Sequence, residues 1–300
     1  MKTVPVILFT YKRIDSLKKS LASLAACDLA AASDLVVYSD APRNEADREK
    51  VMAVRQYLHS VDYFKSLRVV ERTENMGVDY NIINGIKEAA ASFGTFIILE
   101  DDLVFSKNFL LFMNQALAFY ENHPDVLSVS GFSFVSSIPS GYANDGYFTR
   151  RSWSWGWGTW GAKAAKIDWD VKDFSTFIED KSMQQSFNNA GGSDLTKMLR
   201  ETMQGKIRAW DIRLFYYQFK QKMVTLYPVY SKVNNIGFTS EGHNTFGYNR
   251  YKTTLDSSGK KTFSFAADSA VNKKLNEAFL RKNNLFNRIK TRAFSMLGIK

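Results

Sequence analysis

The chain has 300 residues, a length that suits one large α/β domain or two small, closely packed domains. Hydrophobic residues make up 45% and charged residues 23%, and there are only 5 prolines, which excludes a disordered or fibrous protein. The net charge of +10 favours an anionic partner, and the single cysteine, Cys27, excludes an intrachain disulfide.

The first 130 residues repeat one pattern, in which a short β-branched run precedes a segment of helical periodicity at intervals of roughly thirty residues. This pattern is typical of βαβ units and predicts an α/β fold with a mostly parallel central sheet flanked by helices. The expected strands are 4–10, 34–39, 67–71, 95–99 and 126–130. The expected helices are 14–26, 44–58, 78–92 and 106–120, the last with Ser106 as its N-cap.

Polar side chains follow the first four expected strands, at the point where each strand ends. In open parallel sheets, ligands bind beyond the carboxyl ends of the strands. The sequence therefore predicts a ligand site at this edge of the sheet. The polar side chains at these strand ends are Tyr11, Lys12, Arg13, Ser39, Asp40, Glu71, Arg72, Asn75, Glu100, Asp101 and Asp102.

The triplet Glu100-Asp101-Asp102 is the strongest local signal, because three adjacent carboxylates repel one another unless a cation or hydrogen-bond donors offset them. Oxygen ligands of this kind suit Mg²⁺ or Mn²⁺ bound to substrate phosphates. The alternative is an acidic turn at the N-terminus of the helix expected near Ser106. The apolar strand before the triplet favours the metal site, since it fixes the acids at the ligand-binding edge.

Residues 153–161 have the most unusual composition of the chain, with four tryptophans and three glycines. Gly156, Gly158 and Gly161 match G-x-G-x-x-G in spacing, but a dinucleotide site needs this motif within a βαβ unit. Here the motif lies mid-chain and places Trp157 where the backbone would approach a pyrophosphate, so we reject the dinucleotide site. Two interpretations stay open here. The segment is a flexible loop whose Trp157 stacks on a sugar, or it is a tryptophan-rich packing corner.

The strand-end motifs together resemble the GT-A glycosyltransferases, in particular the family 2-like branch that includes N-acetylglucosaminyltransferase I and bacterial sugar transferases. The motifs are Thr10-Tyr11-Lys12-Arg13, Ser39-Asp40, the loop 72–77 and Glu100-Asp101-Asp102, and the similarity covers roughly residues 4 to 245. The resemblance implies a metal-dependent, inverting transfer of a sugar from a nucleotide diphosphate donor, a UDP-sugar. The implied acceptor is a hydroxyl of a glycan or glycolipid, and the transferred group is a hexose or an N-acetylhexosamine.

The same resemblance implies residue roles. The acidic triplet corresponds to the DxD motif, so Asp102 would bind Mn²⁺ or Mg²⁺, while Glu100 or Asp101 would face the ribose and donor sugar. Asp40 would face the base or ribose and Arg13 the pyrophosphate. The chain departs from the usual motif in having Asp101 at the middle position. The full set of expected nucleotide-sugar residues is Thr10, Tyr11, Arg13, Asp40, Arg72, Gly77, Glu100, Asp101 and Trp157.

Two further residues gain roles from the resemblance. Asp211 lies in a Trp-Asp element that supplies the general base in related inverting transferases, and a positioned carboxylate can accept the proton of the attacking hydroxyl. Taken alone, Asp211 would be a helix cap or a partner of Arg213. His243 lies in a polar, glycine-flanked segment that closes over the nucleotide in bacterial members, so it would bind the metal or the diphosphate.

The last twenty residues carry six basic side chains and no acid, interleaved with apolar residues near helical spacing. This predicts a basic amphipathic helix that either lies on an anionic membrane or packs on its own domain. We expect residues 1–105 to form the nucleotide-sugar-binding half, 106–250 the acceptor-binding and catalytic half, and 251–300 a loop and this helix. Without a signal peptide or membrane span in the sequence, we expect a cytoplasmic protein, peripheral at the inner face of the membrane.

Two other functions are compatible with parts of the sequence. A sugar-phosphate nucleotidyltransferase shares the sheet and the acidic site, but the turn after the first strand contains no glycine. A non-catalytic protein that binds nucleic acid or another polyanion would use the +10 charge, although that charge is concentrated in the tail and the expected ligand edge is partly acidic. We therefore expect no nucleic-acid partner.

Overall fold

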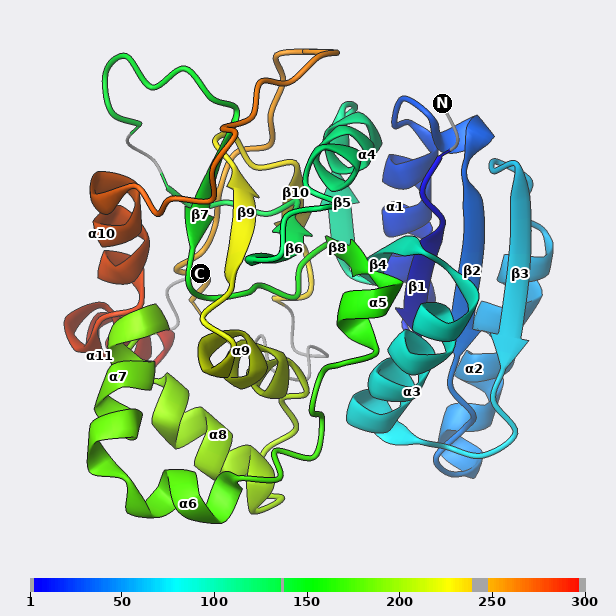
Figure 1. Ribbon diagram of the computed structural model, residues 1–300. Coiled ribbons are helices and arrows are strands. Elements are labelled where there is room, and N and C mark those ends of the chain that lie inside the picture. The colour runs from blue at the N-terminus through cyan, green and yellow to red at the C-terminus, as the bar shows by residue number, and fades with distance from the viewer. Residues whose placement is uncertain (1–2, 136–137, 239–247, 297–300) are drawn as a thin grey trace.

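The computed structural model describes residues 3–135, 138–238 and 248–296. Within these ranges the chain forms an eight-stranded sheet in the order β3-β2-β1-β4-β8-β6-β9-β7, with helices on both faces (Figure 1). The strands of this sheet are β1 (Val6–Thr10), β2 (Asp34–Ser39), β3 (Ser66–Glu71), β4 (Thr95–Glu100), β6 (Val126–Ser130), β7 (Gly146–Thr149), β8 (Trp157–Trp160) and β9 (Val224–Pro228). A small second sheet pairs β5 (Leu103–Phe105) with β10 (Val233–Asn235).

The helices follow the strands in the expected alternation in the first half and cluster in the second. They are α1 (Ile14–Ala25), α2 (Glu45–His59), α3 (Gly77–Ser92), α4 (Phe109–Phe119), α5 (Gly161–Ala164), α6 (Phe174–Glu179), α7 (Lys181–Gly191), α8 (Leu195–Met203), α9 (Asp211–Lys220), α10 (Lys273–Lys282) and α11 (Leu285–Met296). The expected α/β class and the five expected strands are confirmed. The helix expected in the last twenty residues is confirmed as α11, and a further helix, α10, precedes it.

The sheet changes character at its centre. Strands β3, β2, β1 and β4 are parallel, as predicted. Strand β8 then enters between β4 and β6 and pairs antiparallel with both, while β6 and β9 are again parallel. The first half is thus a run of βαβ units, and the second half is a mixed sheet joined to it through β8.

Both faces of the sheet are buried at its central strands, which explains their continuous apolar runs, whereas the edge strand β3 is partly exposed. In β1, Val6 and Leu8 face the core that contains α1, α2, α4 and α10. Ile7 and Phe9 alternate with them and face the core that contains α3 and α6 to α9. With helices packed on both sides, polar groups of these strands reach solvent at the strand ends.

The start of α4 differs from the prediction. The helix begins at Phe109, whose N–H donates to the Ser106 carbonyl at 3.0 Å, and no side chain caps it. The cause lies just upstream, where Leu103–Phe105 forms β5 and pairs with β10. Extended backbone at these residues delays the first helical turn, so Ser106 is not the N-cap.

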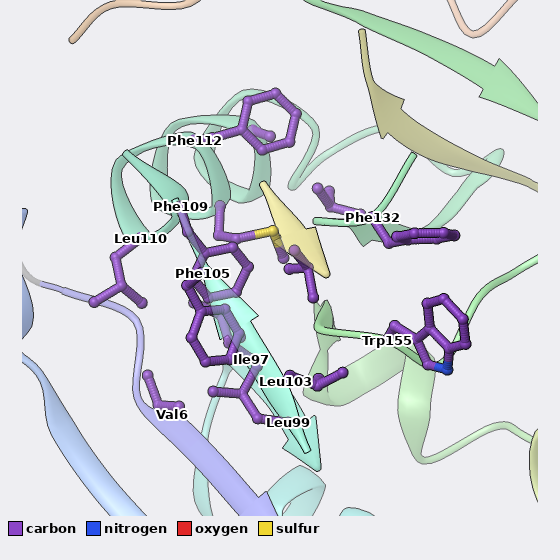
Figure 2. Close-up of a cluster of buried hydrophobic side chains, with 14 of the residues drawn as sticks. Val6, Ile97, Leu99, Leu103, Phe105, Phe109, Leu110, Phe112, Phe132 and Trp155 are labelled. Atoms are coloured by element: carbon purple, nitrogen blue, oxygen red, sulfur yellow. The ribbon is translucent and has the colours of Figure 1, made fainter. Parts of the chain in front are cut away.

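The tryptophan-rich segment is a packing corner, and the expectation of a flexible loop is wrong. Its four indoles are all buried, and residues 157–160 form the central strand β8. A Cβ added at Gly161 would lie 2.4 Å from the Phe93 carbonyl oxygen, so a larger residue would push β8 off its neighbour. Figure 2 shows Trp155 beside Phe132, whose ring centroid lies 4.6 Å from that of the indole.

The segment 248–272 crosses the molecule without helix or strand and is held by a buried ion pair. The Lys232 ammonium contacts the Asp256 carboxylate, and both side chains are only 4% exposed. Asn108 Nδ2 donates to the same carboxylate at 2.9 Å. This pair joins the second sheet, α4 and the chain that leads to the C-terminal helices. No helix within the described ranges combines the length and apolarity of a membrane span.

We predict that Asp256→Ala lowers the free energy of unfolding by about 3–5 kcal/mol, because it leaves the Lys232 charge buried without its partner. Urea denaturation followed by circular dichroism measures this change. The control is Glu201→Ala, which removes the i,i+4 pair with Lys197, whose side chain is 68% exposed, and should cost less than about 1 kcal/mol. Equal costs for the two variants would contradict the structural role of the buried pair.

Candidate functional site

A cavity of about 410 Å³ opens at the carboxyl ends of β1, β2 and β4. The start of α3 closes one side, and Arg208, from the loop before α9, also lines the cavity. Of the nine expected nucleotide-sugar residues, seven line it: Thr10, Tyr11, Arg13, Asp40, Gly77, Glu100 and Asp101. Strand ends that are far apart in the sequence therefore meet in one cavity, as the motif spacing predicted.

Two acids of the triplet share one guanidinium. Arg13 Nη2 contacts Asp101 Oδ1 and lies 3.0 Å from Asp102 Oδ2. The Thr10 hydroxyl donates to the other Asp101 oxygen at 2.8 Å. Both aspartates are nearly buried, at 3% and 6% exposure, so these contacts replace the solvation that the carboxylates lose.

The surroundings of Glu100 favour its neutral form. Burial raises its pKa well above the usual range, and the charges of Asp102 and Asp211 add to the rise. Burial also raises the pKa of Asp102, although Arg13 opposes the shift. With three carboxyl groups and one shared guanidinium, full ionisation would leave an excess of negative charge at this edge of the sheet.

The donor set of the triplet fits a hard divalent cation. In the described part of the chain, no three His, Cys, Asp or Glu side chains converge to hold an ion by themselves. Mg²⁺ and Mn²⁺ do not require such a cage, because they keep several waters and bind substrate phosphates beside one or two carboxylates. Asp102 and its neighbours supply these oxygens and the negative charge.

The start of the segment 234–244 packs directly on Asp102. Asn235 Nδ2 donates to Asp102 Oδ1 at 3.3 Å, and the Ile236 N–H donates to the Asp102 carbonyl at 2.8 Å. A Cβ added at Gly237 would lie 2.2 Å from Asp102 Oδ2, so only glycine allows this approach. The sequence located the segment but did not reveal these two contacts. His243 lies outside the described residues.

Asp40 is used differently from the expectation. Its carboxylate accepts hydrogen bonds from the N–H groups of Met76 and Gly77, both at 2.9 Å, and from Asn75 Nδ2 at 3.2 Å. It also accepts from the N–H of Ala41 at 2.9 Å. Asp40 lines the cavity, yet its carboxylate oxygens are already hydrogen-bonded at the N-terminus of α3. A carboxylate is favourable there because it accepts hydrogen bonds from N–H groups that have no partner within the helix.

Tyr11 lies on the cavity rim, where its hydroxyl is occupied. It donates to Asp47 at 2.8 Å and accepts from the Arg43 N–H at 2.8 Å. Burial and the bond to Asp47 raise the pKa of Tyr11 to about 12, so the phenol stays neutral. Lys12 pairs with the same Asp47 carboxylate at 2.5 Å. This small network sets the shape of the rim.

Arg72 does not belong to the residues that line the cavity. Its Nη1 lies 2.9 Å from Glu88 and its Nε donates to Asn81 at 3.2 Å, so the side chain packs along α3. Its guanidinium carbon lies 4.8 Å from the centroid of the Tyr38 ring. Arg208 and Arg43, which sequence reasoning did not assign to the site, line the cavity instead.

Asp211 occupies the first turn of α9, as the helix-cap alternative expected, and its charge also acts on Glu100. Burial raises the pKa of Asp211 to about 6 and outweighs the opposing effect of Arg151. The preceding residue, Trp210, stacks on Trp157 with ring centroids 6.2 Å apart. Trp157 is 1% exposed, so it supports the element that carries Asp211 and is not placed to stack on a ligand.

Comparisons with known proteins give weak structural matches. No family model and no curated protein sequence matches the chain. A mannosyltransferase of Pyrobaculum calidifontis, PcManGT, in complex with GDP-Man and Mn²⁺ is 17% identical over 52% of this chain and 44% of that chain, with a TM-score of 0.35. TarS 1-349 of S. aureus is 15% identical over 78% and 60% of the two chains, with a TM-score of 0.43.

The same S. aureus fragment in complex with UDP-GlcNAc is 14% identical over 83% of this chain and 62% of that chain, with a TM-score of 0.44. The chain thus spans less than two thirds of the length of each of these proteins. Scores below 0.5 indicate only a partial overlap of the folds, so the function proposed below rests on the side chains of the cavity.

We predict that Asp40→Ala lowers the free energy of unfolding by about 2–4 kcal/mol, because one buried and two partly buried N–H groups lose their charged acceptor. Thermal and urea unfolding measure the change. Asp180→Ala, which removes a half-buried N-cap of α7, is the matched control and should cost about 1 kcal/mol. If Asp40→Ala were as stable as the wild type, the carboxylate would not hold the start of α3.

Proposed function

We propose that the protein is a GT-A type glycosyltransferase that transfers a hexose or N-acetylhexosamine from a UDP-sugar to a hydroxyl of a glycan or glycolipid, with inversion. One observation carries this proposal. Glu100 and Asp101 of the acidic triplet line one cavity at the carboxyl ends of parallel strands, together with Arg13 and the start of α3. Arg13 also lies 3.0 Å from Asp102, and the charge of Asp211 acts on Glu100.

The metal would be held by Asp102, with Glu100 or Asp101 beside it. When bound, Mn²⁺ or Mg²⁺ would act as a Lewis acid that stabilises the negative charge of the departing diphosphate. The excess of carboxylate charge supports this assignment, because a dication would offset it. We further propose that His243, outside the described residues, contributes to the metal or the diphosphate.

The donor would lie along the ends of β1 and β2. Arg13 and Arg208 line the cavity and can pair with phosphate oxygens. Glu100 and Asp101 would face the ribose and the sugar. Asp40 would act indirectly, because three of its hydrogen bonds fix the loop 75–77, which would form the wall for the base and ribose. Gly77, with φ of +70°, lets that backbone turn into α3.

Asp211 would be the general base. A carboxylate with a pKa of about 6 is ionised at neutral pH, and it is more basic than an ordinary aspartate. It would accept the proton of the acceptor hydroxyl as that oxygen attacks the anomeric carbon from the side opposite the diphosphate. Residues 1–105 would then supply the donor half and 106–250 the base and acceptor half.

We predict that one nucleotide sugar raises the melting temperature by about 2 °C or more in the presence of Mn²⁺, because it binds the folded state alone. The panel contains UDP-Glc, UDP-Gal, UDP-GlcNAc and GDP-Man. Asp102→Asn should lose the shift, whereas Glu179→Gln, an exposed change on α6, should keep it.

The melting temperature of each variant without ligand shows whether it folds. A wild-type protein that no donor stabilises at millimolar ligand and metal would reject the nucleotide-sugar site. An Asp102→Asn variant that folds and keeps the full shift would reject Asp102 as the ligand.

We predict that Asp211→Asn lowers kcat by about 10²- to 10⁴-fold and leaves donor binding intact, because only proton transfer loses its acceptor. In the wild type, kcat/KM should rise with pH through about 6, since the base must be ionised to act. Steady-state kinetics with the donor identified above measure both effects. A folded Asp211→Asn variant with normal kcat, or a flat profile between pH 5 and 7, would contradict the role.

A further inference from the structure

Helix α11 exposes a strip of large apolar side chains to solvent. Leu285, Phe286, Ile289 and Met296 are from 60% to 76% exposed, although a side chain of this kind is usually covered. None of the described residues of α11 is buried. The exposed side chains thus leave one side of the helix open. Figure 1 shows α11 at the edge of the molecule, next to α10.

The attached side of α11 is polar and well defined. Ser295 accepts from the Tyr248 N–H at 2.9 Å, and Phe294 packs edge-on against the Tyr248 ring at 5.1 Å. Arg288 Nη1 donates to Ser193 at 3.2 Å. These contacts orient the helix, so the exposure of the apolar strip follows from how α11 is docked.

The open side has the charge pattern of an interfacial helix. At about 100° per residue, Leu285, Ile289, Met296 and Phe286 fall within an arc of about 100° on the helix surface. Arg292 borders this arc on one side and Lys290 on the other, and both are exposed. Cations on both borders of an apolar strip match the surface of a bilayer, in which anionic headgroups cover apolar acyl chains.

The surrounding charge has one sign. The segment 281–300 contains six Lys and Arg residues and no Asp or Glu. Arg281, Lys282 and Lys274 also line a cavity of about 620 Å³ beside α11, where Glu277 is the one acid among the lining residues. A partner protein could match the apolar strip alone, but this excess of positive charge favours a surface that carries negative charge at high density.

We propose that the open side of α11 binds the surface of an anionic phospholipid bilayer, with Phe286 and Ile289 inserted among the acyl chains and Lys290 and Arg292 at the lipid phosphates. The proposal specifies which side chains would make the membrane contact that the sequence led us to expect for residues 281–300. This binding does not depend on sugar transfer, so it can be tested separately from the function proposed above.

The test is co-sedimentation of the full-length protein with phosphatidylcholine vesicles that contain phosphatidylglycerol, and with vesicles of phosphatidylcholine alone. We expect the wild type to pellet with the anionic vesicles only, and added salt to weaken the binding. Phe286→Ser/Ile289→Ser and Lys290→Glu/Arg292→Glu should each weaken partitioning by at least about tenfold.

Matched controls change the same side-chain types elsewhere. Met52→Ser removes another exposed apolar side chain, on α2, and Lys166→Glu/Lys181→Glu makes the same change of net charge away from α11. Both controls should pellet like the wild type. Circular dichroism melting should be unchanged in all variants, because the altered side chains are exposed.

Several outcomes would overturn the proposal. One is equal pelleting with neutral and anionic vesicles, and another is no pelleting with either. A third is equal loss in the controls and the α11 variants. A further outcome is that the strip binds a second copy of the chain, and size-exclusion chromatography with light scattering tests it. A wild-type dimer that Phe286→Ser/Ile289→Ser converts to monomer, without vesicle binding, would assign the strip to a second copy of the chain.

Discussion

The architecture of the site depends on one electrostatic constraint, the placement of three adjacent carboxyl groups at the end of a buried strand. Strand β4 cannot move to relieve their repulsion, because Ile97 and Leu99 are locked in the core that Figure 2 shows. Relief comes instead from Arg13, which follows β1, and from Asn235, which ends β10. Elements from both halves of the chain therefore meet at the acids, and the remaining negative charge is the part that a ligand cation can use.

Asp211 illustrates how burial and repulsion act together on one carboxyl group. The carboxyl group is held in the first turn of α9, behind which Trp210 stacks on the buried Trp157. Burial raises its pKa to about 6. The tryptophan-rich segment therefore acts on Asp211 indirectly. Its Trp157 packs against Trp210 and so helps to hold the start of α9 in place.

The sequence predicted the first half of the fold well, because strands buried on both faces and amphipathic helices leave strong local patterns. It also predicted that Arg13, Asp40 and the acidic triplet would meet, since parallel strands bring their carboxyl ends together. It left open whether Trp157 is buried, because that burial depends on strands β4 and β6 on either side of β8. Nor did it reveal that main-chain N–H groups at the start of α3 donate hydrogen bonds to Asp40, because hydrogen bonds from the backbone do not require particular residue types.

Strand β8 has a mechanical consequence for the cleft. It is hydrogen-bonded to β4 on one side and β6 on the other, so the two halves share one continuous ladder. Two lobes joined by a linker can swing about a hinge, but two halves of one sheet cannot separate without breaking the ladder. The distance between the acids at the end of β4 and Asp211 at the start of α9 is therefore expected to change little, and the proposed substrate would have to match it.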